Sequence, residues 1–410
     1  LSQAMSLCIE MGEDLMVLPG DVFDAPVPSH NTLFHAVHSF AAAKSASSNV
    51  EITLEKEGST TKVNYSGTLI LAIHGNHEYL GKETRTALDI LNLAGVLVYF
   101  HAAKIIVEKP GEGGIERLAV HGLGAVPEKK ALAAMQQWNP KPLPDAANII
   151  LVHQSFKEFM AIDDEMVATL SLDDLPKGFD LIVDVHLHWA NRQELGPVTH
   201  GGNENSGHPK EDFAVQAKDA AKTVFLLAGS TIATAIKRLE CESSKGVHIF
   251  DTASKELVFH PLPRQRRMFY HQITLKEADA QTALQECRGA IEGDLKQSLE
   301  MNPLIRVNLK GSVKKGLGPS DINLSGVFAE YSGRVILSIS KNFSAPEFKR
   351  KIADLREMQK SRLSVAQLGF EMLEKNLRET DFGEGFSVKE LFALLSDEEI
   401  DKAMALVTKS

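Results

Sequence analysis

The chain has 410 residues, of which 43% are hydrophobic and 24% are charged, and its formal net charge is −10. This length predicts two or three domains, and the apolar fraction excludes a wholly disordered chain. No apolar run reaches the roughly 18–20 residues that span a bilayer. The three cysteines include no CxxC pair, which excludes a disulfide framework and predicts an intracellular protein.

The first residues have the pattern of the middle of a helix. Leu1, Met5 and Cys8 follow helical spacing, and no N-cap residue precedes them. We therefore expect an element upstream of Leu1, so that the sequence is truncated at its N-terminus.

Five short apolar runs alternate with helical patterns and end in polar residues. The runs are 15–18, 69–73, 149–152, 181–183 and 224–227. Continuous apolar runs of this length are typical of strands buried on both faces, and their alternation with helices predicts an α/β fold. Because ligands bind beyond the carboxyl ends of such strands, we expect the polar residues to meet at one rim. Residues 45–65 alternate instead and predict a peripheral hairpin.

The pattern changes after Pro261. A strand at 268–275, a helix at 278–299 and strands at 304–309 and 335–340 predict a smaller α+β unit, followed by a helical tail. Residues 301–350 hold eight Lys and Arg against three Asp and Glu, which makes this stretch locally basic. The expected domains are therefore 1–262, 263–345 and 346–410.

The polar residues that follow the strands form a mixed set of oxygen and nitrogen ligands. They are Asp21, Asn76, His77, His153, His186 and His188. Such a set without thiolate suits Mn²⁺, Fe or Zn²⁺, and a carboxylate such as Asp21 can bridge two ions. His186 and His188 share one side of an extended segment. Two ions would activate a water for phosphoryl displacement, and His77 could stabilise charge or protonate the leaving oxygen. A single histidine after a strand is more often structural, so the prediction depends on the whole set.

Four segments resemble the ordered motifs of calcineurin-like metallophosphoesterases. They are Gly20–Asp24, Gly75–Glu78, Val152–Gln154 and His186–His188. The stretches 25–29, 87–91, 121–124, 228–234 and 261–269 resemble the double-strand-break repair nuclease of the meiotic-recombination-eleven type, whose bacterial counterpart is SbcD. The resemblance implies an α/β fold: a β-sandwich flanked by helices, a smaller α+β capping domain that contacts DNA, and a helical C-terminal tail.

The resemblance also implies a role for each rim residue. Asp21 would bridge two Mn²⁺ ions, which Asn76, His153 and His186 hold on one side and His188 on the other. His77 would act on the transition state. The implied reaction is hydrolysis of phosphodiesters at DNA ends, by 3′-to-5′ exonuclease and single-strand endonuclease activity; other divalent metals remain open.

The sequence departs from the family pattern in three places. The family begins with a strand that carries Asp-x-His, and no such motif lies upstream of Asp21. We therefore expect one metal site to be incomplete and the activity of this chain to be weak or absent. Val185 stands where the family usually has Gly, and Glu78 where it usually has Asp; we expect both replacements to be tolerated.

The implied partners are DNA ends, a second copy of the chain and an SMC-like ABC ATPase of the Rad-fifty type. The dimer would form through the helices at 31–43 and 84–93, with Leu33, Phe34, Val37, Phe40, Ala87, Leu88 and Leu91 as candidate contacts. Ordinary packing of these apolar residues on the sheet is the alternative. The ATPase would bind the tail helices. The candidate phosphate contacts are Arg264, Arg266, Arg267, Lys310, Lys314 and Lys315.

The sequence also allows two other functions. The chain could be a non-catalytic scaffold that binds DNA ends and the ATPase, which the missing Asp-x-His strand favours. It could also be a generic metal-dependent phosphatase, which the second domain and the tail disfavour. No localisation tract is visible, so we favour a prokaryotic cytoplasm and nucleoid, or the nucleus in a eukaryote.

Overall fold

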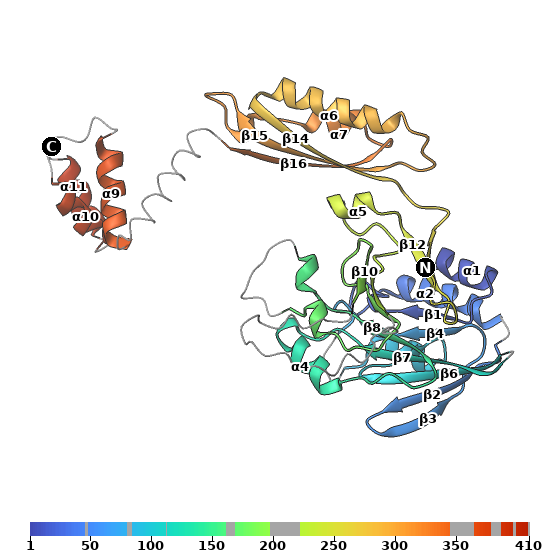
Figure 1. Cartoon of the computed structure of the whole chain (residues 1–410). Coiled ribbons are helices and arrows are strands. Elements are labelled where there is room, and N and C mark those ends of the chain that lie inside the picture. The colour runs from blue at the N-terminus through green and yellow to red at the C-terminus, as the bar shows by residue number, and fades with distance from the viewer. Residues whose placement is uncertain are drawn as a thin grey trace, which may run out of the picture. The chain divides into compact units, whose positions relative to one another are not determined.

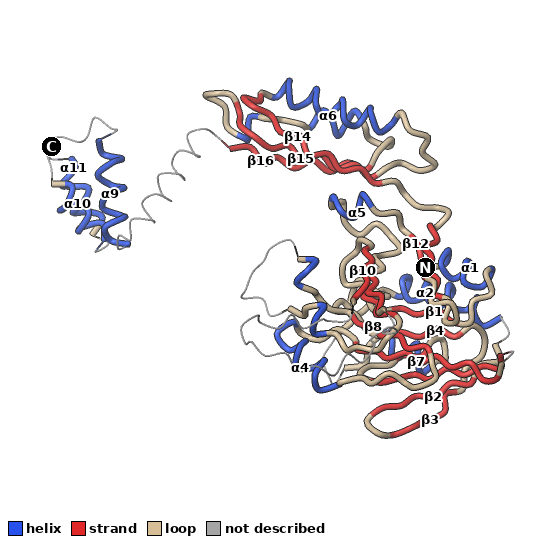
Figure 2. Tube along the Cα trace, viewed as in Figure 1, coloured by secondary structure: helices blue, strands red, loops and turns tan. Residues whose placement is uncertain are grey.

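The chain divides into two compact units. The computed structural model describes residues 1–45, 48–79, 84–111, 113–160, 169–196, 222–344, 365–378, 387–396 and 399–408. The first unit comprises Leu1–Tyr270 with Leu299–Leu304, and the second comprises His271–Ser298 with Ile305–Ser410. Figures 1 and 2 show the elements of each unit.

Two sheets form the centre of the first unit. The larger sheet has the strand order β10 (Asn191–Leu195), β11 (Thr223–Leu227), β9 (Leu181–Asp184), β8 (Ala147–Val152), β7 (Gly114–Leu123), β6 (Ala103–Gly111), β2 (Glu51–Lys56) and β3 (Ser59–Val63). The smaller sheet has the order β1 (Leu15–Leu18), β4 (Leu69–Ala72) and β5 (Val98–Tyr99). A separate antiparallel pair joins β12 (Gly246–Phe250) to β13 (Leu257–Pro261).

The five strands predicted from apolar runs are all present. They are shared between the two sheets, with β1 and β4 parallel in the smaller one and β8, β9 and β11 parallel in the larger one. The predicted hairpin is confirmed as well, since β2 and β3 pair antiparallel, with Ile52 opposite Val63, at the edge of the larger sheet.

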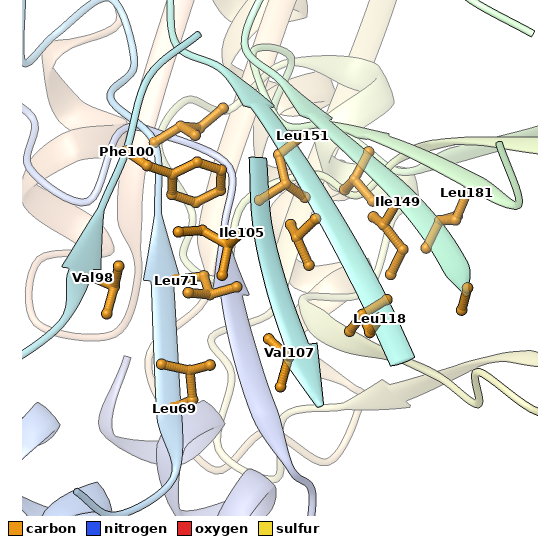
Figure 3. Close-up of a cluster of buried hydrophobic side chains, with 14 of the residues drawn as sticks. Leu69, Leu71, Val98, Phe100, Ile105, Val107, Leu118, Ile149, Leu151 and Leu181 are labelled. Atoms are coloured by element: carbon orange, nitrogen blue, oxygen red, sulfur yellow. The ribbon is translucent and has the colours of Figure 1, made fainter. Parts of the chain in front are cut away.

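The main core lies between the two sheets. Alternate residues contribute to it: Leu69 and Leu71 from β4, Ile105 and Val107 from β6, and Ile149 and Leu151 from β8 (Figure 3). The alternation follows from the two-residue period of a strand, which points every second side chain to the same face. Fully burying each such side chain stabilises the fold by roughly 1.5–3 kcal/mol.

The outer faces of both sheets are covered by helices. Ile70 and Ala72 of β4 pack with Phe40 of α2 (His30–Ala41) and Leu88 of α3 (Ala87–Leu93), beside α1 (Ser2–Glu10). On the other side, Ile150 and Phe225 pack with Met135 of α4 (Glu128–Trp138). This layering is the β-sandwich flanked by helices that the sequence predicted.

Helix α3 begins at a residue whose side chain caps it. Thr86 accepts a hydrogen bond from the Asp89 amide at 3.3 Å, and the Asp89 carboxylate accepts one from the Thr86 amide at 2.8 Å, which closes a capping box at the start of α3. Further short helices of the first unit are α5 (Arg238–Glu242) and the 3₁₀ turns Ala42–Ser45, Lys157–Phe159 and Leu172–Asp174.

The second unit contains a three-stranded sheet and several helices. The sheet has the order β14 (Met268–Ala278), β15 (Leu304–Val313) and β16 (Ile336–Ser344). Its helices are α6 (Ala280–Leu295), a 3₁₀ turn Pro319–Asp321, α7 (Ser325–Glu330), α9 (Val365–Arg378), α10 (Val388–Ser396) and α11 (Ile400–Thr408). The division between the units falls inside β14, and the predicted start of the tail at residue 346 lies outside the described residues. Across the described helices, none is both long and apolar enough to cross a membrane.

Candidate metal centre

The turn after β1 aims the Asp21 carboxylate at two other loops. Gly20 and Asp21 both adopt positive φ angles, of 110° and 51°. A Cβ atom at Gly20 would collide with the ring of His153, so this position requires glycine. One Asp21 oxygen accepts a hydrogen bond from the His77 amide at 3.0 Å, and the other lies 3.1 Å from Nε2 of His153.

Asn76 lies between two histidines of the other sheet. Its Oδ1 atom is 3.0 Å from Nε2 of His153 and 3.2 Å from Nδ1 of His186. The two imidazole rings meet edge to face, with centroids 5.1 Å apart. Asp21, Asn76, His153 and His186, here called the four-residue cluster, therefore come together from the ends of β1, β4, β8 and β9.

The surroundings of His153 fit a bound cation. Its Nδ1 donates a proton to the Pro19 carbonyl oxygen at 3.0 Å, because that oxygen can only accept. The buried Nε2 then faces two oxygens, of Asp21 and Asn76. In a neutral ring, its lone pair would oppose theirs, whereas a proton or a metal ion would resolve the conflict. Burial alone would lower the pKa of His153, but the Asp21 contact outweighs burial and raises it.

The amide of Asn76 is an essential part of this arrangement. Within the described residues, no three His, Cys, Asp or Glu side chains are grouped so that they could hold a metal ion by themselves. One carboxylate, one amide oxygen and two imidazoles form the donor set instead. These donors suit a divalent transition metal.

Two buried carboxylates hold the loops of the cluster. Glu78 accepts hydrogen bonds from the amides of Gly75 at 2.9 Å, Asp21 at 3.1 Å and Phe23 at 3.1 Å, which ties the first two loops together. Asp184 accepts a hydrogen bond from the Gln154 amide at 3.0 Å, beside His153. Burial raises the pKa of each carboxyl to about 7. Sequence reasoning assigned neither residue a role, although each is a carboxylate within two positions of a motif histidine.

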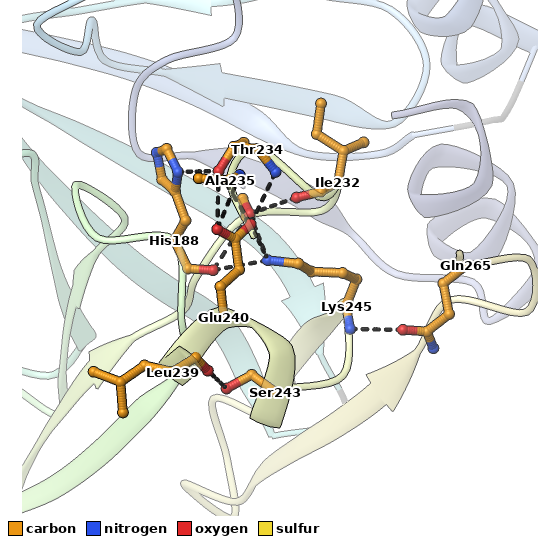
Figure 4. A network of polar contacts seen from close by, with 10 residues as sticks. His188, Ile232, Thr234, Ala235, Leu239, Glu240, Ser243, Lys245 and Gln265 are labelled. Carbon is orange, nitrogen blue, oxygen red and sulfur yellow. Dashed lines mark hydrogen bonds and ion pairs between the residues drawn. The ribbon is translucent and has the colours of Figure 1, made fainter. Parts of the chain in front are cut away.

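His188 makes its hydrogen bonds away from the four-residue cluster. Its Nδ1 contacts the hydroxyl of Thr234, and its carbonyl oxygen accepts a hydrogen bond from Nζ of Lys245 at 2.9 Å (Figure 4). Lys245 also forms an almost fully buried ion pair with Glu240 at 2.9 Å. We call His188, Thr234, Glu240 and Lys245 the His188 corner. His186 and His188 are close in sequence, but their hydrogen-bond partners differ.

His77 lies at the surface beside the cluster. Its side chain is 41% exposed, and its Nδ1 lies 3.2 Å from the carbonyl oxygen and 3.3 Å from a carboxylate oxygen of Asp24. A cavity of about 1040 Å³ is lined by His77, Asp21 and His188, and also by β1 and β12. Asn76, His153 and His186 line a separate cavity of about 300 Å³. The predicted rim residues thus line two separate cavities of the first unit.

The candidate phosphate contacts are divided between the units. Arg264, Arg266 and Arg267 belong to the first unit and the three lysines to the second. The Arg267 guanidinium lies 5.9 Å from the centroid of the Phe269 ring. Lys310 donates a hydrogen bond to Gln272 at 2.9 Å, while Lys314 is paired with Asp279.

The expected dimer residues need a correction. Phe40, Ala87, Leu88 and Leu91 are buried in the core of their own unit and cannot face a partner. The exposed apolar side chains of the same two helices are Phe34 at 65%, Val37 at 37%, Ile90 at 55% and Leu93 at 90%. Helical spacing identified the apolar positions but not which of them the sheet covers.

Two facing sheets with helices on both outer sides, and a carboxylate, an amide and two imidazoles at their strand ends, define the fold class of calcineurin-like metallophosphoesterases. Comparison with known proteins gives relatives that are more specific than this class. No protein-family profile matches the chain. It is similar to the double-strand break repair protein MRE11 of Rattus norvegicus, with 25% identity over 233 residues, which is 49% of this chain and 32% of the rat protein.

Two further relatives carry the same name. The Caenorhabditis elegans protein is 23% identical over 292 residues, covering 64% of this chain and 37% of that protein. The DNA double-strand break repair protein Mre11 of Saccharolobus solfataricus is 26% identical over 204 residues, covering 48% of this chain and 45% of that protein. The matched region therefore spans less than half of each relative's length. These matches confirm the resemblance predicted from the sequence motifs.

Proposed function

We propose that this chain is the nuclease subunit of a DNA double-strand-break repair complex and hydrolyses phosphodiester bonds at DNA ends. The observation that carries the proposal is the four-residue cluster, in which Asp21, Asn76, His153 and His186 meet from four strand ends. Similarity to proteins named for double-strand break repair supports the choice of DNA as the substrate.

Each residue has a proposed part in this reaction. Asp21, Asn76, His153 and His186 would hold one Mn²⁺ ion, and Asp21 and His188 would hold a second. Bound metal supplies an activated water and neutralises phosphate charge. His77, exposed beside the cluster, would stabilise charge on the phosphate or protonate the leaving oxygen. The proposed products are those of a 3′-to-5′ exonuclease and a single-strand endonuclease.

Glu78 and Asp184 would keep the ligand loops in place. Glu78 accepts three amide hydrogen bonds from the loops that carry Asp21 and Asn76, and Asp184 holds the residue that follows His153. Rigid support of this kind matters because the partners that orient a metal ligand typically change metal affinity by about 10–100-fold.

A second candidate function is a non-catalytic scaffold for DNA ends. Asp21 and His188 are the two residues assigned to the second ion, whereas four residues are assigned to the first. With one site incomplete, the chain would bind ends and its partners but cleave slowly.

Metal binding and cleavage measured together separate these functions. We expect calorimetry to show Mn²⁺ binding that Asp21→Ala abolishes, and a 3′-labelled duplex to be degraded slowly in Mn²⁺. His77→Ala should remove this cleavage, and His30→Ala, a change at an exposed histidine, should retain it. End binding without any cleavage would establish the scaffold. Cleavage that persists both in His77→Ala and without Mn²⁺ would refute the proposed site.

We propose three interaction surfaces for the partners of this nuclease. A homodimer would form through Phe34, Val37, Ile90 and Leu93, which expose apolar surface on α2 and α3. Light scattering should show a dimer that Phe34→Glu dissociates. A dimer that persists in this variant would exclude the surface.

The helical tail is the proposed site for an SMC-like ABC ATPase of the Rad-fifty type. Its helices expose Leu395 at 45%, Ile400 at 64% and Met404 at 62%, and amphipathic helices commonly dock into apolar grooves. The predicted capping domain, residues 263–345, would contact DNA. A nucleoid or nuclear location would follow from these partners.

A further inference from the structure

The ring of His188 is joined to a buried carboxylate through a single hydroxyl. Nδ1 of His188 contacts Oγ1 of Thr234, and the same hydroxyl lies 3.1 and 3.3 Å from the two carboxylate oxygens of Glu240 (Figure 4). Thr234 ends the stretch 228–234 that carries the family resemblance, whereas Glu240 lies outside every motif. The three residues are 46 and 6 positions apart along the chain.

Glu240 is held in its ionised form. It accepts hydrogen bonds from the amides of Thr234 at 2.9 Å and Ala235 at 3.1 Å, and from Nζ of Lys245 at 2.9 Å. Burial would raise the pKa of Glu240, but these donors outweigh burial and lower it. An ionised carboxylate can only accept hydrogen bonds.

The protons in the hydrogen bonds that link His188, Thr234 and Glu240 can therefore be assigned. A threonine hydroxyl has one proton, and here that proton is donated to Glu240. Towards His188, the hydroxyl can then act only as an acceptor, so Nδ1 of His188 must carry the proton that bridges them. In a neutral imidazole with a proton on Nδ1, the lone pair is on Nε2.

We propose that Thr234 and Glu240 are positioning residues that fix the tautomer of His188, so that Nε2 is the nitrogen available to a divalent cation. Hydrogen bonds also hold the main chain of His188. Nζ of Lys245 donates to the His188 carbonyl oxygen at 2.9 Å and to the Ser230 hydroxyl at 2.8 Å. His188 lines the same cavity as Asp21 and His77. The tautomer follows from the hydrogen bonds alone, whereas its use for a cation rests on the proposed function.

His153 shows that the same tautomer can be set in another way. Its Nδ1 donates directly to the carbonyl oxygen of Pro19, which cannot change its role. The His188 tautomer depends instead on a side-chain hydroxyl, which a substitution can remove. Outer partners of a metal-binding histidine typically change metal affinity by about 10–100-fold.

Nitrogen-15 NMR of histidine side chains tests the tautomer directly. The full chain, metal-free and labelled at histidine, would be compared with Thr234→Val, Thr234→Ser and Thr223→Val, and His188→Gln would assign the signals. Thr223 is the matched control, since its buried hydroxyl donates to the Phe179 carbonyl oxygen at 2.7 Å, just before β9. We expect the Nδ1-protonated pattern in the wild type, the serine variant and the control, and loss of that pattern in Thr234→Val.

A titration with Mn²⁺, monitored by electron paramagnetic resonance, measures the effect of the tautomer on metal binding. Thr234→Val should weaken binding at the His188 site by about 10–100-fold, and Thr234→Ser should restore it. Unchanged His188 signals in Thr234→Val, or failure of serine to restore them, would overturn the inference. If the tautomer shifts as expected but no variant or wild-type chain binds Mn²⁺, the positioning role stands and the proposed metal function fails.

Discussion

The four-residue cluster and the His188 corner hold their histidines in opposite ways. In the cluster, the candidate ligands contact one another, with Asn76 and Asp21 both next to Nε2 of His153. In the corner, His188 contacts Thr234 and Lys245, neither of which is a candidate ligand. The difference indicates that contacts among the candidate ligands themselves join the cluster, whereas other side chains hold His188 in the corner.

The largest expected effect is the loss of the ion pair that supports the corner. Lys245→Met leaves the Glu240 carboxylate buried without its cation, and removing one partner of a buried pair costs about 3–5 kcal/mol. Urea unfolding should show this loss of stability. Lys222→Met, which breaks the exposed pair with Glu194 at 3.0 Å, should have a much smaller effect, because solvent screens an exposed ion pair. Equal effects of the two variants would mean that the corner is not structurally important.

The next effect concerns the residue shared by both proposed ions. Asp21→Ala should lower Mn²⁺ affinity by about 100-fold or more, because even outer partners of a ligand change affinity by about 10–100-fold. Calorimetry would measure it, with Asp173→Ala at an exposed carboxylate as the control. A small change in affinity would mean that Mn²⁺ binds elsewhere and that the four-residue cluster is not a metal site.

His121 lies outside both regions, and its protonation should make the stability of the fold depend on pH. Burial lowers the pKa of His121 from 6.5 to about 4. Between these values the unfolded chain binds the proton and the folded chain does not, so stability falls as the pH drops from 6.5 to 4, by up to roughly 3 kcal/mol. His121→Phe should remove this part of the acid sensitivity.

Urea unfolding at a series of pH values checks the titration of His121. The replacement suits its surroundings, because the ring packs edge to face on Phe179 with centroids 5.1 Å apart. An unchanged slope of stability against pH would show that the pKa of His121 is the same in the folded and the unfolded chain.

The smallest effect lies in the second unit. Lys310→Ala should reduce the salt slope of DNA binding by about 1, as expected for one phosphate contact. Lys314→Ala should change the slope less, because Lys314 is already paired with Asp279. Fluorescence anisotropy at several salt concentrations distinguishes the two variants. Equal slopes in both variants and the wild type would remove these lysines from the interface.

The sequence identified the parts of the molecule that depend on local pattern. Apolar runs located β1, β4, β8, β9 and β11, because strands buried on both faces have no polar positions. The residues after four of these strands meet, since parallel strands bring their carboxyl ends to the same edge.

The same patterns did not assign each strand to a sheet. They also did not distinguish the buried Leu88 and Leu91 of α3 from the exposed Ile90 and Leu93. An amphipathic helix shows which positions are apolar, but the neighbouring elements decide which of them are covered.

By itself, the sequence determined the layered fold, the rim residues and the resemblance to a nuclease family, because these depend on residue type and spacing along the chain. Only the tertiary structure decided the contacts of Glu78, Asp184, Thr234 and Glu240. Their hydrogen bonds join segments up to 57 positions apart. Burial makes those bonds obligatory, since a buried carboxylate without donors is too costly to keep.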